Sequence, residues 1–279
     1  MKLKDQIQRL QRPAILLGNG INRLDNTLPD WKSLLQRVGG RSLSFEGLTY
    51  SEVYDFIELR DGKGKEIKKR ICLELSLDET DFLDYHREFL KIVQLHECPV
   101  LTTNFDLSLK KAGNLKKYRT KNKGFTRWYP WDIYYAQESL IYPTDGFGVW
   151  HIHGLIDYSE SLRMGLSDYM GSVEKSRRWF HRGGAPLFKG KDTNNWRGRY
   201  TWLHIWFNSP LIIVGLQLNS QEVFVRWLLI ERERYFKKFP DRRQSTLFMD
   251  KGNDPTILNF LQNFNIDHIT VKDYSDLYS

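Results

Sequence analysis

Four short runs of apolar residues, each bounded by proline, glycine or polar side chains, are the clearest feature of the sequence. They lie at 14–17 (AILL), 99–104 (PVLTTN), 149–156 (VWHIHGLI) and 210–215 (PLIIVG). Short apolar runs with such boundaries are typical of buried strands. Strand-like patterns also occur at 133–136 (IYYA), 140–143 (LIYP), 245–250 (STLFMD) and 266–271 (IDHITV).

Segments with the helical period of apolar residues separate these strands. They are 3–11, 28–38, most of 51–96, 105–113, 221–239 and 255–264. Pro13 ends the first segment, Pro29 and Asp30 begin the second, and Gly113 closes the fourth. The stretch 157–199 is basic and rich in glycine, and there we expect loops and short helices.

The alternation of strands and helices predicts an α/β fold, a Rossmann-like doubly wound parallel sheet with helices on both faces. We expect residues 1–279 to form one domain, with a helical insertion around 40–97 and a basic, irregular insertion around 157–205. In such sheets the ligand binds at the C-terminal ends of the strands. Four polar or glycine-rich segments follow predicted strands and should converge there: GNG at 18–20, TTNFD at 102–106, HIHG at 151–154 and VGLQLN at 214–219.

The first two of these segments suit phosphate and hydroxyl chemistry. Gly18 and Gly20 permit close approach of the backbone to a phosphate, or they form a plain turn. Asn104 carries both a donor and an acceptor, so it can orient a water or a hydroxyl. Asp106 can accept a hydrogen bond from an amide, or it can merely cap the next helix.

The other two segments add histidines and a helix start. His151 and His153 are two residues apart on a predicted strand, so they should point to one face. No HExxH or CxxC motif supplies further metal ligands, and no metal is expected. We interpret one histidine as catalytic, because His is the usual base near neutral pH, and the other as packed or hydrogen-bonded. Asn219 or Ser220 should cap the helix that follows.

The composition limits the class of protein and the kinds of partner that can be expected. The 279 residues are 41% hydrophobic and 14% aromatic, which suits a folded chain rather than a disordered one. Two cysteines, Cys72 and Cys98, cannot build a four-thiolate zinc site. No segment is apolar enough for a signal peptide or a membrane span, so we expect a cytoplasmic protein that does not bind membranes. The net charge of +8 permits a polyanionic partner.

Taken in order, five segments resemble the motifs of the sirtuin-like superfamily, and more closely its bacterial branch found in phage defence. They are GNGIN at 18–22, LPDW at 28–31, TTNFD at 102–106, HIHG at 151–154 and VGLQL at 214–218. MGLSDY at 164–169 also resembles a segment that follows the HG motif in that branch. The resemblance extends from residue 13 to residue 230, although the stretches between the motifs match poorly.

The resemblance implies NAD as the substrate and a role for each matching residue. Asn104 would position the ribose or the attacking water, His153 would be the catalytic histidine, and Asp106 would hold the nicotinamide carboxamide. Asn22 stands where the family has serine, and Leu216 and Gln217 replace small hydroxyl residues. The other matches would bind NAD, with its pyrophosphate at the first motif and its adenosine at the last: Gly18, Asn19, Gly20, Ile21, Asn22, Asp30, Gly215, Leu218 and Asn219.

A missing part of the family pattern changes the expected reaction. Deacylating sirtuins carry a four-cysteine zinc module that builds the acyl-lysine groove, and two cysteines cannot make it. Water is then the expected acceptor, and the resemblance implies an NAD glycohydrolase that releases nicotinamide and ADP-ribose. Such an enzyme would be a defence effector that depletes cellular NAD. Because this activity harms the host, we expect a resting state inhibited by a homo-oligomer or by a separate sensor or partner protein.

Other functions stay open. One is a nucleic-acid-binding module, because the stretch 163–199 mixes Arg and Lys with Trp and Tyr, a pattern that suits single strands. The same stretch could instead reach nucleic acid through a partner. Another is a scaffolding subunit that senses NAD or ADP-ribose without turnover, and a third is transfer of ADP-ribose to a macromolecule. The helix at 221–238 has apolar residues on more than one face, so it is buried or pairs with another chain.

Overall fold

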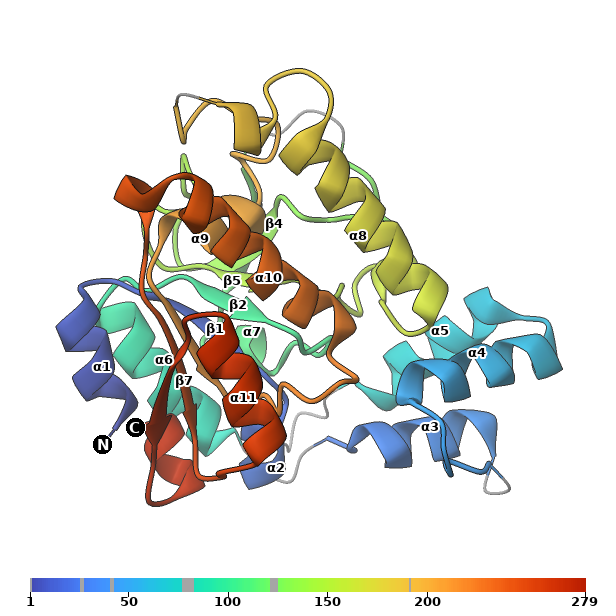
Figure 1. Ribbon diagram of the computed structural model, residues 1–279. Helices are drawn as coiled ribbons and strands as arrows, with labels where there is room; N and C mark the ends of the chain where they lie inside the picture. The colour runs from blue at the N-terminus through green and yellow to red at the C-terminus, as the bar shows by residue number, and fades with distance from the viewer. Residues whose placement is uncertain (1, 26–27, 41–42, 77–82, 121–124, 191) are drawn as a thin grey trace.

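The computed structural model describes residues 2–25, 28–40, 43–76, 83–120, 125–190 and 192–279. Within them the chain forms an eight-stranded sheet in the order β3-β4-β5-β2-β1-β6-β7-β8 (Figure 1). The α/β class predicted from the sequence is confirmed. The strands are β1 (Ala14–Leu17), β2 (Val100–Thr102), β3 (Lys116–Arg119), β4 (Ile133–Ala136), β5 (Val149–His151), β6 (Leu211–Val214), β7 (Thr246–Asp250) and β8 (Asp267–Thr270).

Six neighbouring strands, from β5 through β2, β1, β6 and β7 to β8, run parallel, and β1 lies between β2 and β6. The prediction of a parallel sheet is wrong at one edge, because β3 and β4 form an antiparallel pair and β4 runs antiparallel to β5. A parallel connection needs a crossover, usually a helix, and residues 137–148 between β4 and β5 contain none.

Two details of this edge differ from the sequence prediction. Residues 140–143, which have a strand-like pattern, form a bend instead. Asp145 fixes that bend, because its carboxylate accepts from the Tyr142 amide at 2.8 Å and its own amide donates to the Tyr142 carbonyl at 3.1 Å. Strand β3 is not predicted, because three of its four residues are charged. Lysine is common on edge strands, where it discourages pairing with other chains.

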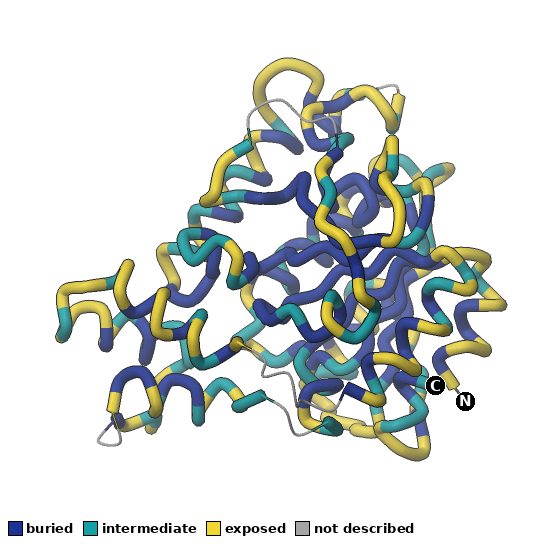
Figure 2. Tube along the Cα trace, turned by 180° about the vertical axis from the view of Figure 1, so that it is seen from behind, coloured by how far each residue is buried: buried dark blue, intermediate teal, exposed yellow. Residues whose placement is uncertain are grey.

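Alternate residues of the central strands supply two cores, one on each face of the sheet. Ala14 and Leu16 of β1 belong to the first core, and Ile15 and Leu17 belong to the second. Figure 2 shows the buried strands in the middle of the molecule, with exposed residues on the outer helical surfaces. The first core is covered by α8 (Leu166–His181), α9 (Trp202–Asn208), α10 (Val223–Lys238) and α11 (Pro255–Asn263). The second is covered by α1 (Leu3–Leu10), α2 (Gly20–Asp25), α6 (Asp84–Leu95) and α7 (Ser108–Ala112).

The basic stretch 157–199 is more regular than predicted. It contains the 16-residue helix α8, where only loops and short helices were expected. The start of α8 is fixed by Asp168, whose carboxylate accepts from the backbone amides of Met164 and Gly165. The helix is held down by Trp179 and Phe180, which are buried in the first core. Short 3-10 helices occur at η1 (Ser159–Ser161), η2 (Leu187–Lys189), η3 (Pro240–Arg242) and η4 (Tyr274–Leu277).

Three further helices pack around a third core beside the sheet. They are α3 (Trp31–Gly39), α4 (Tyr50–Asp61) and α5 (Gly64–Glu74), which Figure 1 shows together on the side away from α1 and α6. Helix α4 begins with a capping box, in which Thr49 and Glu52 satisfy each other's backbone amides. Of the predicted helical insertion at 40–97, α4 and α5 therefore join α3, whereas α6 packs on the sheet.

Candidate functional site

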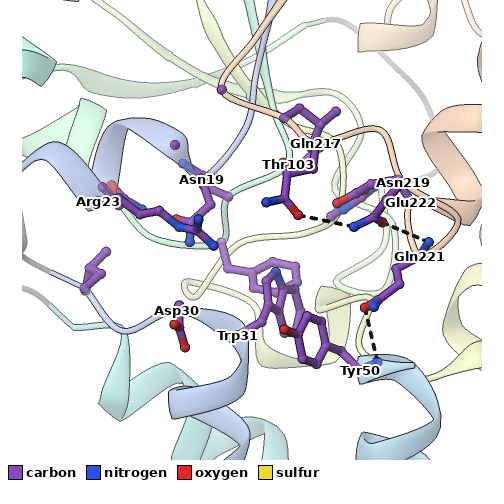
Figure 3. Close-up of a pocket in the computed structure, with 18 of the residues that line it drawn as sticks. Asn19, Arg23, Asp30, Trp31, Tyr50, Thr103, Gln217, Asn219, Gln221 and Glu222 are labelled. Carbon is purple, nitrogen blue, oxygen red and sulfur yellow. Dashed lines mark hydrogen bonds between the residues drawn. The ribbon is translucent and has the colours of Figure 1, made fainter. Parts of the chain in front are cut away.

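A pocket of about 540 Å³ opens where the C-terminal ends of the parallel strands meet. This volume lies in the usual range for small-ligand sites. Residues after β1, β2, β5, β6 and β7 line it, together with the start of α3, the start of α4 and the C-terminal segment. Figure 3 shows side chains that follow β1, β2 and β6 facing others at the starts of α3 and α4 across the space. Nine of the twelve predicted site residues line this pocket: Asn19, Gly20, Asn22, Asp30, Asn104, Asp106, His153, Gly215 and Asn219.

The other three predicted residues support the pocket from behind. Ile21 and Leu218 are fully buried in the second and first cores, respectively. Gly18 packs against the end of β6, where a Cβ atom would lie 2.4 Å from the Gly215 carbonyl oxygen. These residues are therefore placed to shape the strand ends, and none of them lines the pocket.

The ends of β1 and β6 approach each other closely at Gly20 and Gly215. The Gly20 amide donates to the Gly215 carbonyl at 2.9 Å, and Gly215 has a φ of +65°, which favours glycine. A Cβ atom on Gly20 would lie 2.9 Å from the Gly215 Cα atom and 2.7 Å from the Tyr278 hydroxyl. A side chain at either glycine would clash with these neighbouring atoms, so the pocket wall at this point consists of backbone alone.

Asn104 is held in the wall by three contacts after β2. Its amide nitrogen Nδ2 donates to the Gly18 carbonyl at 3.4 Å, and its backbone amide donates to Thr102 Oγ1 at 3.1 Å. Its backbone carbonyl accepts from His151 Nδ1 at 2.8 Å, so His151 is the hydrogen-bonded histidine of the pair. The side-chain oxygen Oδ1 of Asn104 is buried and has no hydrogen-bond partner among the described residues.

His153 lies in the turn after β5 and not on the strand, which ends at His151. The sequence predicted that the two histidines share one strand face, and this prediction is wrong because the strand ends at His151. The His153 ring contacts Tyr169 edge-on, with ring centroids 5.4 Å apart, and lies 6.0 Å from Phe224. Burial, together with the nearby Arg163 charge, lowers the pKa of His153 to about 3, so the ring is neutral. Its Nε2 atom has no partner in the described part of the chain.

Asp106 accepts hydrogen bonds from two amides and is not the N-cap of α7, which is Leu107. Its Oδ1 atom accepts from the Ser108 amide at 2.9 Å, next to the start of α7, and Oδ2 accepts from Asn22 Nδ2 at 2.9 Å. Asn22 Nδ2 also donates to Asn19 Oδ1 at 2.6 Å. Asp30 caps α3 by accepting from the Ser33 amide at 2.7 Å. The polar wall of the pocket is thus a connected array rather than a set of separate side chains.

The segment after β6 bridges the sheet to the helices beside it. Helix α10 begins at Val223, so Asn219 is not its N-cap. Asn219 instead accepts from the Gln221 amide at 3.0 Å and donates to Gln217 Oε1 at 3.2 Å. Gln221 Oε1 then accepts from the Tyr50 amide at the start of α4 at 3.4 Å, as Figure 3 shows.

Several pocket residues are not among the predicted site residues, although one of them, Trp31, ends the LPDW motif. Trp31 and Tyr50 stack with their ring planes 9° apart and their centroids 6.4 Å apart, forming an aromatic wall. Glu222 lines the pocket, and burial raises the pKa of its carboxyl to about 7. Arg23 also lines it, three residues after Gly20 in the chain. Tyr278, in the C-terminal segment, places its hydroxyl next to Gly20 and Gly215 at the ends of β1 and β6. This contact depends entirely on the tertiary fold.

Within the described residues, no group of three or more His, Cys, Asp or Glu side chains is arranged to hold a metal ion. The helices described there are also too short or too polar to span a bilayer. No protein-family model matches the sequence, and a search of curated proteins finds no match. What the pocket binds must therefore be inferred from the side chains that line it.

Proposed function

We propose that the protein is an NAD glycohydrolase that cleaves NAD to nicotinamide and ADP-ribose. One observation carries this proposal: Asn104 Oδ1 and His153 Nε2 are buried polar atoms with no hydrogen-bond partner among the residues that the structure describes, and both residues line one pocket. A buried polar atom without a hydrogen bond is unfavourable, so a bound ligand or water is the natural partner. Both atoms can accept a proton or hydrogen bond from a ribose hydroxyl or a water.

The glycine ends of β1 and β6 would hold the pyrophosphate. Bare backbone at Gly20 and Gly215 lets phosphate oxygens approach closely. Arg23 is the one cationic side chain among the residues that line the pocket. An arginine suits phosphate because it offers several donors in a fixed planar fork.

The pocket also contains several acidic side chains, and their negative charge suits the reacting end of NAD. Asp30, Asp106, Glu222, Asp250 and Asp254 all line it. The nicotinamide ring of NAD is cationic, and the ribose becomes oxocarbenium-like as the glycosidic bond breaks. Carboxylates in a partly desolvated site stabilise such positive charge more strongly than water does. We assign Asp106 to the carboxamide and the stacked Trp31 and Tyr50 to the aromatic ring.

The reaction needs water and no other reactant. The bond between ribose C1′ and the nicotinamide nitrogen breaks, and its electron pair neutralises the ring. Water oxygen, placed by Asn104, bonds to C1′. Neutral His153 accepts a proton from this water or from a ribose hydroxyl and then returns it to solvent. Proton transfer to a positioned histidine contributes a rate factor of about 100 to 10,000.

Nicotinamide release by the purified chain tests this proposal. Wild type should release nicotinamide, and Asn104→Ala and His153→Gln should each lose at least about 100-fold in rate. Asn194→Ala, a change in an exposed loop, is the matched control and should keep full activity. Activity that survives in both site variants would contradict the assignment of these residues.

A second candidate is a subunit that senses NAD or ADP-ribose and docks on nucleic acid. The exposed cations Arg177, Arg178 and Arg182 on and after α8 favour it. Such a protein would bind NAD without releasing nicotinamide, and its affinity for single strands would fall steeply with salt. ADP-ribose left on a macromolecule would instead indicate transfer.

A further inference from the structure

Two backbone amides at the glycine ends of β1 and β6 are already engaged within the fold. The Gly18 amide donates to the Val214 carbonyl at 2.9 Å, and the Gly20 amide donates to the Gly215 carbonyl at 2.9 Å. A bound anion needs hydrogen-bond donors to replace the water that it loses. Because these two amides are occupied, a side chain is the natural source of a donor at this part of the pocket.

The hydroxyl of Tyr278 occupies the space that the two glycines leave open. A Cβ atom on Gly20 would lie 2.7 Å from the Tyr278 oxygen, and a Cβ atom on Gly215 would overlap this oxygen as well. Tyr278 is also among the residues that line the pocket, together with both glycines. The hydroxyl therefore meets the pocket at the point where β1 and β6 end side by side.

The rest of Tyr278 is fixed in the second core. The residue is only 1% exposed, and its ring packs edge-on against Phe89 of α6, with the ring centroids 6.4 Å apart. Its backbone amide donates to the Ser275 carbonyl at 3.1 Å. A ring held in this way presents its hydroxyl in one position, so little side-chain entropy is lost when a ligand binds.

The hydroxyl is free to donate a hydrogen bond to a ligand. Within the part of the chain that the structure describes, no hydrogen bond joins it to another residue. Burial raises the pKa of the Tyr278 phenol, the Asp250 charge adds to this effect, and the Arg23 charge opposes it. The phenol therefore keeps its hydrogen at neutral pH. Arg23 and the hydroxyl together must offset the repulsion between Asp250 and a bound anion.

The order of the strands indicates which part of NAD the hydroxyl would meet. Asn104 follows β2 and His153 follows β5, and both strands lie on the same side of the junction between β1 and β6. Neighbouring strands are about 4.8 Å apart, so this junction is roughly 7 Å from the end of β2. That distance is close to the width of one ribose. With its reacting ribose at Asn104 and His153, NAD would bring its diphosphate to the junction.

We propose that the Tyr278 hydroxyl donates a hydrogen bond to the diphosphate of bound NAD, beside the positive charge of Arg23. The proposal rests on the proposed function for the identity of the ligand. A tyrosine that merely fills the core would gain nothing from a buried hydroxyl without a partner, because such a group is unfavourable in the empty protein. A ligand that accepts from the hydroxyl explains why the core ends in tyrosine here.

Binding of ADP-ribose to the full chain, measured by calorimetry, tests this assignment. Tyr278→Phe keeps the ring and removes only the hydroxyl, so it should weaken binding about 10- to 100-fold, as loss of a hydrogen bond to a charged group does. The melting temperature of this variant should equal or exceed that of wild type. Tyr142→Phe is the matched control and should bind like wild type, because Tyr142 stacks on Tyr200 and does not line the pocket.

Equal affinity of wild type and Tyr278→Phe would overturn the role of Tyr278. Tighter binding by the variant would overturn it too, because the hydroxyl would then block the anion. A fall in melting temperature would likewise count against it, since the hydroxyl would then have a partner in the fold.

Nicotinamide release, measured separately, distinguishes these failures from failure of the proposed function. If ADP-ribose binding depends on Tyr278 but NAD is not cleaved, then hydrolysis fails and the role of Tyr278 stands. If NAD is cleaved and Tyr278→Phe binds ADP-ribose like wild type, then only the role of Tyr278 fails. If wild type binds no ADP-ribose, both the ligand and the role of Tyr278 fail.

Discussion

Two ionisable residues of the pocket have pKa values displaced in opposite directions by burial. The pKa of His153 falls to about 3 and that of Glu222 rises to about 7. Burial disfavours the charged form of each group, which keeps His neutral and makes Glu easier to protonate. The His153 ring is therefore neutral at pH 7, and a pKa of about 3 makes it a weak base in the free protein. Displaced pKa values of this kind cluster at functional sites.

The effect of burial on the pKa of Glu222 can be tested by replacing this residue and measuring the stability of the fold. The folded-state pKa of Glu222 lies above its ordinary value of 4.5, so the stability it contributes is present below pH 4.5 and is lost as the pH rises through 7. Glu222→Gln removes the partly buried charge. Its melting temperature should match wild type at pH 4.5 and exceed it at pH 8.

Thermal unfolding across this pH range makes the comparison, with Glu66→Gln as the control. Glu66 is an exposed residue of α5, with 57% of its side chain accessible. A wild-type protein that is equally or more stable than Glu222→Gln at pH 8 would show that Glu222 is charged and satisfied in the fold.

At the scale of elements, much of the architecture could be predicted from the chain. Runs such as LIIV in β6 are short, apolar and sharply bounded, and the structure places strands there. The prediction fails where tertiary contacts decide. Strand β3 is charged because it lies at an edge, and α8 is stable because Trp179 and Phe180 are buried beneath it.

The turn that carries His153 depends on the glycine after it. Gly154 has a φ of +99°, and a Cβ atom there would lie 2.2 Å from the Ser161 carbonyl oxygen. Gly154→Ala should therefore lower the free energy of unfolding by about 1–3 kcal/mol or more. It should also displace His153 and reduce any turnover.

Urea unfolding measures this loss against a matched substitution. Gly184→Ala is the control, because Gly184 is exposed and a Cβ atom there would contact nothing. Equal stabilities for the two variants would show that the turn tolerates a side chain, and the account of the HG segment would need revision.

At the scale of the whole molecule, the parallel sheet assembles the site. Residues 17, 102 and 214 lie level with one another on β1, β2 and β6, so the segments that follow leave the sheet side by side. The predicted convergence of four strand ends follows from this register. Contacts such as Tyr278 with the glycine ends, or His86 behind Asn22, join segments far apart in sequence, and no local pattern announces them.

Features beyond one chain stay predictions. The oligomer or inhibiting partner stays a prediction, and α10 gives no reason to require one. Its residues Phe224, Val225, Leu228 and Leu229 are buried within the same chain. Burial in the first core accounts for the apolar residues on several faces of this helix.

The most direct measurement is the mass balance of NAD incubated with the purified chain, read by chromatography. NAD should disappear, and nicotinamide and free ADP-ribose should appear in equal amounts. Asn104→Ala should consume NAD at least about 100-fold more slowly while still binding it. NAD that is bound but never consumed by wild type would contradict hydrolysis, and NAD that does not bind would contradict the assignment of the pocket itself.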